Sequence, residues 1–304
     1  MAIHIDQTAP DQPGEPDGHG HGQPGHGHHH HETPEQAASI SEVLDLDAEV
    51  LADYLRGVTG WVAGLLPAGA GRVLDLGAGT GTGTVALAAR FPLAQVYAFD
   101  VDESMLARVR GRAEVAGMAD RVNTVRGDLD RPWPALEPVD LVWASSSLHE
   151  VVDSAFVLSS ARAALVPGGV LVVIEIDDTP RFLPDDFVLG RPGLEVRLRA
   201  ALDLVQSRWG HPDWASHLDA AGFSGVGQRT FEIDLPHGEA TGRYARAYLA
   251  RMRPALAEQT AAGALEADDL AVLDALLDDD SPESLLRRDD LHVRGSRTAW
   301  FGRA

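Results

Sequence analysis

Residues 73–84, VLDLGAGTGTGT, place an acidic side chain and closely spaced glycines directly after a short apolar run. Asp75 is followed by Gly77, Gly79 and Gly81, so alternate positions carry no side chain. Such glycines let a ligand approach the backbone closely before a helix begins. Because a carboxylate repels phosphate, Asp75 favours a ligand that carries positive charge.

The same glycines do not fit the dinucleotide fingerprint G-x-G-x-x-G. Counting from Gly77 and Gly79, the third glycine position is Thr82; counting from Gly79 and Gly81, it is Thr84. A nicotinamide oxidoreductase on a related fold is therefore disfavoured. S-adenosylmethionine carries a sulfonium and an ammonium and no phosphate, and suits the aspartate better.

The composition excludes several other chemistries. The chain of 304 residues has a net charge of -21, no cysteine and no lysine. It therefore offers no Schiff-base lysine, Walker lysine, thiolate nucleophile, cysteine-ligated metal or disulfide. The acidic balance predicts no nucleic-acid partner. Without an apolar run of about 18 residues or a signal peptide, we expect a cytoplasmic protein that does not enter membranes, in an oligomeric state that the sequence leaves unknown.

Strand-like and helix-like segments alternate around the glycine loop, which predicts a parallel sheet with helices on both faces. In such sheets ligands bind beyond the carboxyl ends of the strands. The expected strands are RVLDL, QVYAFD, RVNTVRG, VDLVWAS and GVLVVIEID, with helices ending at Arg90 and spanning about 103–116 and 153–165.

The flanking segments complete the expected organisation. Residues 1–36 are rich in His, Gly and Pro and are predicted to be disordered, leaving a domain over 37–304 with its core at 70–178. Apolar spacing predicts an amphipathic helix from Val50 to before Pro67. Further expected elements are a helix over about 193–221, a strand near 225–234, a helical insertion near 239–289 and a last strand, RTAWFGR.

Four ordered motifs over residues 72–176 resemble the class I S-adenosylmethionine-dependent methyltransferases. They are the D-x-G-x-G-x-G loop, YAFDVD at the second strand, VRGDLD at the third, and LVPGGVLVVIE at the fifth. The resemblance implies a Rossmann-like α/β fold, with seven strands that are mostly parallel and a last strand that is antiparallel. It also implies S-adenosylmethionine as the cofactor, held by Asp75, Gly77, Ala78, Gly79, Gly81, Asp100, Val101, Gly127, Asp128, Leu129 and Ser145.

Within this resemblance, Asp100 takes the place of the acid that binds both ribose hydroxyls, which a carboxylate can do by accepting two hydrogen bonds. Asp102 is its close competitor, although the apolar run stops at Asp100. The turn at Gly127–Leu129 matches the one that contacts adenine.

The segment ASSSLHEV after the fourth strand bears on the substrate. Amino-methylating DNA enzymes carry an Asp/Asn-Pro-Pro-aromatic motif here, so that class is excluded. Metal-dependent catechol-type members carry a metal-binding aspartate here, whereas this chain has Ser145 to Ser147. Asp177 and Asp178 could still bind a metal, but a solvated acidic loop is the favoured interpretation, and no metal is expected.

His149 is the best candidate for a catalytic base, since a neutral imidazole near its usual pKa of about 6.5 can accept a proton from a hydroxyl or amine. Packing or orienting the cofactor is the competing role, and Glu150 and Glu175 are lesser candidates. Trp209, His211 and Trp214 could form an aromatic wall for the acceptor or belong to the core.

We therefore expect a methyltransferase that modifies oxygen or nitrogen of a small molecule, with a non-catalytic S-adenosylmethionine-binding regulator as the alternative. The amino-terminal tail adds a histidine cluster that could bind metal weakly or be an inert linker. It comprises His19, His21, His26 and His28 to His31.

Overall fold

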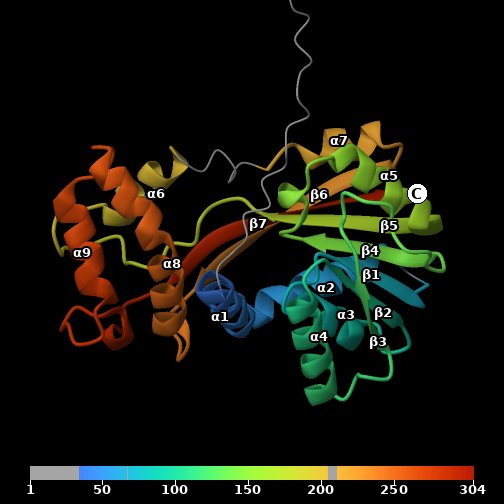
Figure 1. Cartoon of the computed structure of the whole chain (residues 1–304), viewed down its shortest axis with the longest axis horizontal. Coiled ribbons are helices and arrows are strands. Elements are labelled where there is room, and N and C mark those ends of the chain that lie inside the picture. Colours follow the sequence, from blue (N-terminus) through green and yellow to red (C-terminus); the bar gives the residue numbers. More distant parts are fainter. Residues whose placement is uncertain (1–33, 67, 205–210) are drawn as a thin grey trace, which may run out of the picture. The chain divides into compact units, whose positions relative to one another are not determined.

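The computed structural model describes residues 34–66, 68–204 and 211–304, with side chains from residue 40 onward. The histidine-rich tail up to residue 33 and Trp209 lie outside the described residues. A seven-stranded sheet runs through the chain in the order β3-β2-β1-β4-β5-β7-β6 (Figure 1). Its strands are β1 (Arg72–Leu76), β2 (Gln95–Asp100), β3 (Val122–Arg126), β4 (Val139–Ser145), β5 (Leu165–Ile176), β6 (Ser224–Leu235) and β7 (Val293–Arg303).

Strand directions confirm the fold class expected from the sequence. The pairs β1–β2, β1–β4, β2–β3 and β4–β5 are parallel, whereas β7 runs antiparallel to both neighbours, β5 and β6. The carboxyl ends of β1, β2, β3 and β4 therefore meet at one edge of the sheet, where ligands bind in folds of this kind.

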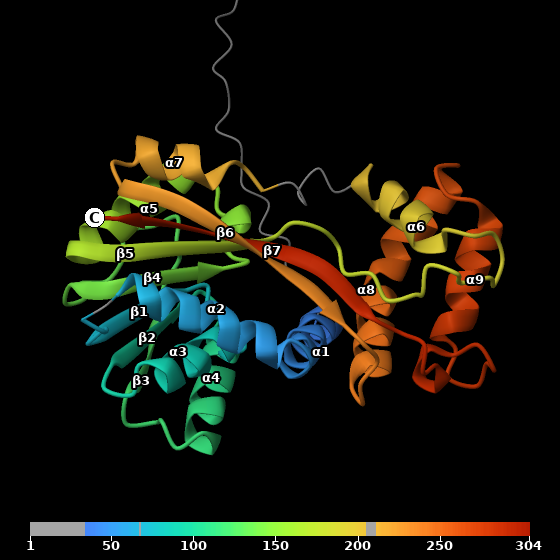
Figure 2. The ribbon, with the colours of Figure 1, turned by 180° about the vertical axis from the view of Figure 1, so that it is seen from behind.

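Helices cover both faces of the sheet, as Figures 1 and 2 show. One apolar core joins a face to α2, α3 and α4, and a second joins the other face to α5 and α7. The buried strands are accordingly rich in Val and Leu. The helices are α2 (Ala52–Leu65), α3 (Thr82–Arg90), α4 (Glu103–Val115), α5 (Ser154–Ala164) and α7 (Trp214–Ala220).

A third apolar core is built from α1 (Pro34–Val50), α6 (Leu194–Asp203), α8 (Thr241–Ala261) and α9 (Ala267–Leu277). The predicted helical insertion at 239–289 corresponds to α8, α9 and a short 3₁₀ turn, Leu285–Arg287. No helix in the described ranges is long and apolar enough to cross a membrane.

Two predicted segments differ from the structure. The single helix expected over 193–221 is two helices, α6 and α7, on either side of residues 205–210, which are not described. Pro212 prevents a helix from continuing, and Asp213 caps α7 by accepting a hydrogen bond from Ala215 N. Helix α1 was not predicted, and it begins at Pro34, inside the expected tail.

Candidate functional site

The glycine loop between β1 and α3 has left-handed backbone at alternate positions. The φ angles are 66° at Gly77, 52° at Gly79 and 87° at Gly81, which other residues rarely adopt. A Cβ at Gly77 would lie 2.5 Å from Ser147 Cβ, and one at Gly81 would lie 2.9 Å from Val109 Cα. A Cβ at Gly79 would meet only Leu44 Cδ1, at 3.9 Å. Gly77 and Gly81 thus allow close packing, whereas Gly79 leaves space open for a ligand.

Asp75 lies at the end of β1 beneath this loop and is 2% exposed. Its carboxylate accepts a hydrogen bond of 2.6 Å from Thr84 Oγ1. Burial raises the pKa of Asp75 to about 7, which the hydrogen bond with Thr84 opposes and the charge of Asp100 reinforces. A buried carboxylate of this kind favours a cationic ligand, because the cation replaces the solvation that the carboxylate has lost.

Asp100, at the end of β2, connects the second strand to the glycine loop. One carboxylate oxygen accepts a hydrogen bond of 2.8 Å from Gly79 N, and the other accepts one of 2.9 Å from Asp102 N. Each oxygen retains a lone pair for a ligand hydroxyl. Asp102 instead caps α4 by accepting a hydrogen bond from Ser104 N. The geometry thus favours Asp100 over Asp102 as the diol-binding residue.

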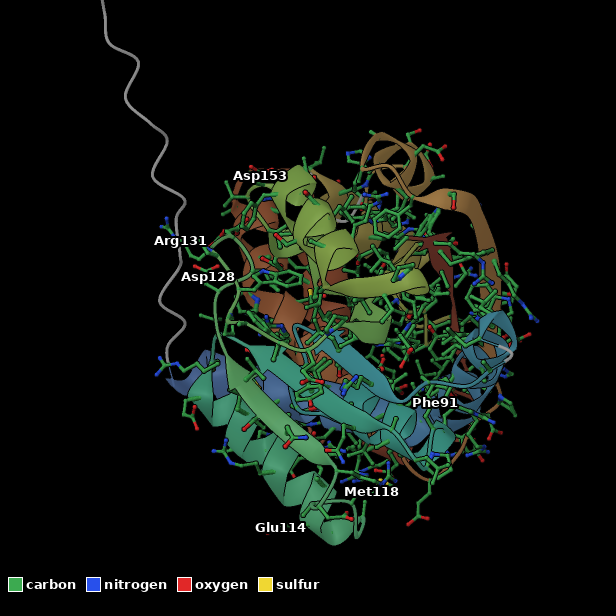
Figure 3. The ribbon with its side chains drawn as sticks, turned by 90° about the vertical axis from the view of Figure 1, so that its right-hand side faces the viewer. Phe91, Glu114, Met118, Asp128, Arg131 and Asp153 are labelled. Carbon is green, nitrogen blue, oxygen red and sulfur yellow. The ribbon has the colours of Figure 1, made fainter. Side chains whose placement is uncertain are left out.

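The loop after β3 follows the same edge of the sheet. Gly127 N donates to Asp100 O at 3.0 Å, and a Cβ at Gly127 would lie 2.5 Å from the ring of Phe99. Asp128 and Arg131 lie on this loop (Figure 3), with Arg131 Nε 3.9 Å from the Asp128 carboxylate. Leu129 packs against the second core, and Val101 is 59% exposed beside Asp100.

Residues after β4 complete this edge. Ser145 ends the strand, and Ser146 has a φ of 53°, an unusual value for a residue with a side chain. Ser146 N donates to Ile174 O, and Ser147 Oγ donates to Leu76 O at 2.8 Å. These bonds attach the segment to β5 and β1, so that it forms a fixed wall.

A cavity of about 1090 Å³ opens at this edge. Of the sequence-predicted site residues, it is lined by Asp75, Gly77, Ala78, Gly79, Ser145 and His149. The other predicted residues lie outside its lining, on the adjoining loops: Gly81, Asp100, Val101, Gly127, Asp128 and Leu129. Asp100 is linked to the lining through its hydrogen bond with Gly79.

Comparison with known proteins shows which proteins this part of the chain is similar to. Residues 73–169 match a family model described as a methyltransferase domain. Trans-aconitate 2-methyltransferase from Pseudomonas aeruginosa is 32% identical over 139 residues, which cover 42% of this chain and 48% of that protein. A 27-O-demethylrifamycin SV methyltransferase from Amycolatopsis mediterranei is 32% identical, covering 42% and 47%. The ubiquinone/menaquinone biosynthesis C-methyltransferase UbiE from Cereibacter sphaeroides is 34% identical, covering 38% and 46%.

Residues 73–169 thus match a methyltransferase domain, in agreement with the motifs of the sequence. The chain spans about half the length of the curated relatives that it matches. The stretch matched by the family model includes the glycine loop. Among solved structures, the YcgJ protein from Bacillus subtilis aligns with a TM-score of 0.50 at 16% identity, covering 83% of this chain and 98% of that one. This likeness concerns the fold.

His149 lies between two carboxylates. Its Nδ1 is 2.8 Å from Glu175 Oε2, and its Nε2 is 3.3 Å from Glu150 Oε1. Burial lowers the pKa of His149, but the hydrogen bonds and charges of Glu150 and Glu175 outweigh it and raise the pKa to about 9. The pKa of His149 thus lies well above the usual value of about 6.5 on which its expected role as a base depends.

The other candidate residues from the sequence have structural partners. Trp214 is 1% exposed inside the second core and does not line the cavity, so it forms no acceptor wall. His211 Nε2 lies 3.1 Å from Asp177, which also accepts a hydrogen bond from Thr298, and Asp178 pairs with Arg199. Within the described ranges, no group of three or more His, Cys, Asp or Glu side chains is arranged to hold a metal ion.

The remaining part of the cavity was missed by the sequence analysis. We call it the α1–α8 wall, the lining that comes from α1, α2, α8 and β7. Its polar centre is Arg297, which donates to Asp47 and stacks on the ring of Tyr54 at 5.0 Å. Tyr244 OH also donates to Asp47, at 2.8 Å. The wall further includes Ile40, Val43, Leu51, Tyr248 and Met252.

Proposed function

We propose that this protein transfers a methyl group from S-adenosylmethionine to an oxygen or nitrogen atom of a small molecule. The observation that carries the proposal is the single cavity that joins the glycine loop to the α1–α8 wall. At about 1090 Å³ it is larger than most sites for one drug-sized ligand, so it can accommodate a cofactor and an acceptor together.

The residues at the carboxyl edge of the sheet fit this cofactor. Asp75, buried below the glycine loop, suits the ammonium group. The open space in front of Gly79 admits the cofactor, and Asp100 would accept hydrogen bonds from its ribose hydroxyls. Val101 and Gly127–Leu129 would flank the adenine.

When bound, S-adenosylmethionine supplies an already activated methyl group on a sulfonium. The protein then has to align the acceptor and exclude water, which is where much of the rate enhancement of an in-line displacement arises. Leu44 of α1 lies over Gly79 and helps to exclude water from the cavity.

The environment of His149 bears on which acceptor atom suits the site. An imidazolium held by Glu150 and Glu175 is not a base. This suits an oxygen or nitrogen that attacks through a lone pair it already carries, and whose proton passes to water after the transfer, better than a carbon that must first lose a proton. His149 instead acts as a positioning residue that fixes the segment after β4. The names of the relatives refer to small molecules, trans-aconitate and a rifamycin among them, which agrees with a small acceptor.

The test is mass spectrometry of the purified protein with S-adenosylmethionine carrying an isotopically labelled methyl group and a metabolite extract. The expected result is S-adenosylhomocysteine together with a labelled product whose methyl group is on oxygen or nitrogen. Binding of S-adenosylmethionine without any turnover across a broad acceptor panel would instead identify a regulator. Absence of binding would refute the proposal at its first step.

A further inference from the structure

Strand β6 forms one edge of the sheet (Figure 2). It pairs with β7, and in the described ranges no strand pairs with its other side. At 12 residues it is as long as β5, which is paired on both sides. An open strand edge presents backbone N–H and C=O groups that can pair with a further strand.

A groove of about 390 Å³ runs along this open edge. It is lined by Asp53, Tyr54 and Gly57 of α2 and by every residue of β6 from 229 to 235. Because the side chains of a strand alternate between its two faces, a groove on one face would be lined by every second residue. Seven consecutive lining residues therefore place the groove at the backbone edge, along about 20 Å of strand. On the α2 side, a Cβ at Gly57 would meet nothing within 4 Å, so the groove is open there.

The two faces of β6 differ beside the groove. Phe231 faces α2, with its ring centroid 5.9 Å from that of Tyr54, and Ile233 shares this face. Glu232 and Asp234 lie on the opposite face and are exposed. A strand added at this edge would also alternate, with one set of side chains beside the apolar face and the other set beside the two carboxylates.

The arginines near the acidic face have other partners. Arg294 lies opposite Asp234 on β7, but its guanidinium donates to Asp185. Arg229 projects from the other face of β6, where it lies 4.8 Å from the centroid of an aromatic ring. Opposite charges on neighbouring strands stabilise their pairing. The positions next to Glu232 and Asp234 therefore suit basic side chains.

A second copy of the chain fits this edge poorly. In an antiparallel pair of β6 strands related by a twofold axis, the acidic faces of both strands lie on the same side of the sheet. Glu232 and Asp234 would then lie close to their own copies, and like charges on neighbouring strands are destabilising. The net charge of -21 on each chain adds to this repulsion.

We propose that the open edge of β6 binds an extended segment of a basic partner protein, in which apolar and basic residues alternate, as a further strand of the sheet. Backbone hydrogen bonds with β6 supply affinity, and the two different faces select the sequence. Tyr54 lines both this groove and the main cavity, so the bound segment lies next to the α1–α8 wall.

The test is calorimetric titration of the full chain with three synthetic peptides that are blocked at both ends. The basic probe is TRVRVRVT, the acidic probe is TEVEVEVT, and the block probe, TRRRVVVT, has the composition of the basic probe without its alternation. We expect the basic probe to bind about tenfold more tightly than either of the others, as two cross-strand charge pairs allow. With ¹³C-labelled valine carbonyls, the basic probe should show the infrared amide band of a β-sheet when bound.

Charge reversal tests the assigned face. The double variant Glu232→Lys with Asp234→Lys should bind the acidic probe more tightly than the basic one. The matched control, Glu114→Lys with Asp120→Lys, makes the same change of net charge at exposed residues outside the groove and should keep the wild-type preference. Both double variants should bind S-adenosylmethionine as the wild type does, which verifies that the sheet is intact.

Several outcomes would overturn the inference. These are no binding of the basic probe up to about 1 mM, equal binding of the block probe, and a preference that changes equally in the control variant. Dimerisation of the chain that the basic probe displaces would assign the edge to a second copy instead.

Discussion

Replacing Asp75 with asparagine is expected to stabilise the protein without cofactor at pH 8 and to weaken cofactor binding. Burial of the carboxylate raises the pKa of Asp75 in the folded state to about 7, from an ordinary value of 3.8. Above pH 7 the wild type must therefore keep an ionised carboxylate out of water. Asparagine retains an acceptor for Thr84 but carries no charge, so it avoids this cost.

The sign and size of the effect follow from proton linkage. Between pH 4 and 7 the folded state binds more protons at Asp75 than the unfolded state, so wild-type stability falls as pH rises and then levels off. The shift of roughly three pKa units corresponds to about 4 kcal/mol, of which about 2 kcal/mol falls between pH 5.5 and 7. Other titrating groups are common to both proteins and cancel in the difference.

The assay is urea unfolding of the wild type and Asp75→Asn at half-unit steps from pH 5.5 to 8.5, without cofactor. The free energy of unfolding of the variant should exceed that of the wild type by an amount that grows as pH rises to 7 and is constant above it. Titration with S-adenosylmethionine at pH 8 should show at least tenfold weaker binding, since a charge-assisted hydrogen bond is lost. A stability difference that does not change with pH would refute the argument that burial raises this pKa.

The remaining predictions concern four other side chains. Asp100→Ala should weaken S-adenosylmethionine binding by at least tenfold, as measured by calorimetry. Asp102→Ala should keep that affinity but lower the free energy of unfolding in urea by about 1 kcal/mol, because the α4 cap is lost. The single-turnover rate should show no rise near pH 6.5, because the raised pKa keeps His149 protonated until pH approaches 9. A rise near pH 6.5 that His149→Gln abolishes would instead identify His149 as the general base. Asp47→Ala should destabilise the fold by about 3 kcal/mol or more, because it leaves Arg297 buried and unpaired, and a loss within 1 kcal/mol would show that the pair is dispensable.

The sheet and its glycine loop were predictable because their signals are local. Each strand is a short apolar run, and Asp75 and Asp100 stand where two of those runs stop. Parallel strands bring these ends to one edge without any further information. The sequence therefore predicted both the fold class and the place of the cavity.

The α1–α8 wall was missed because its signal is interrupted by a charge. Ile40, Val43 and Leu44 have helical spacing, but Asp47 occupies the next apolar position of α1. It is accommodated there by Arg297, 250 residues further along the chain. No local pattern connects two such positions.

The raised pKa of His149 could not be predicted from the sequence for a related reason. Glu150 is its neighbour in the chain, but Glu175 comes from β5, and its 2.8 Å contact depends on the register of that strand. A histidine judged from neighbouring residues alone keeps its ordinary pKa, whereas two carboxylates from different elements raise it.

The pairing of Asp47 with Arg297 also has a consequence for biosynthesis. The strands and helices around the glycine loop lie within residues 72–176, so their contacts are available while the chain is still being made. The α1–α8 wall needs β7, which leaves the ribosome long after α1. Until then Asp47 lacks its guanidinium partner, and the apolar side of α1 lacks part of its cover. During translation, the part of the cavity that is lined by the glycine loop can thus form before the part that is lined by the α1–α8 wall.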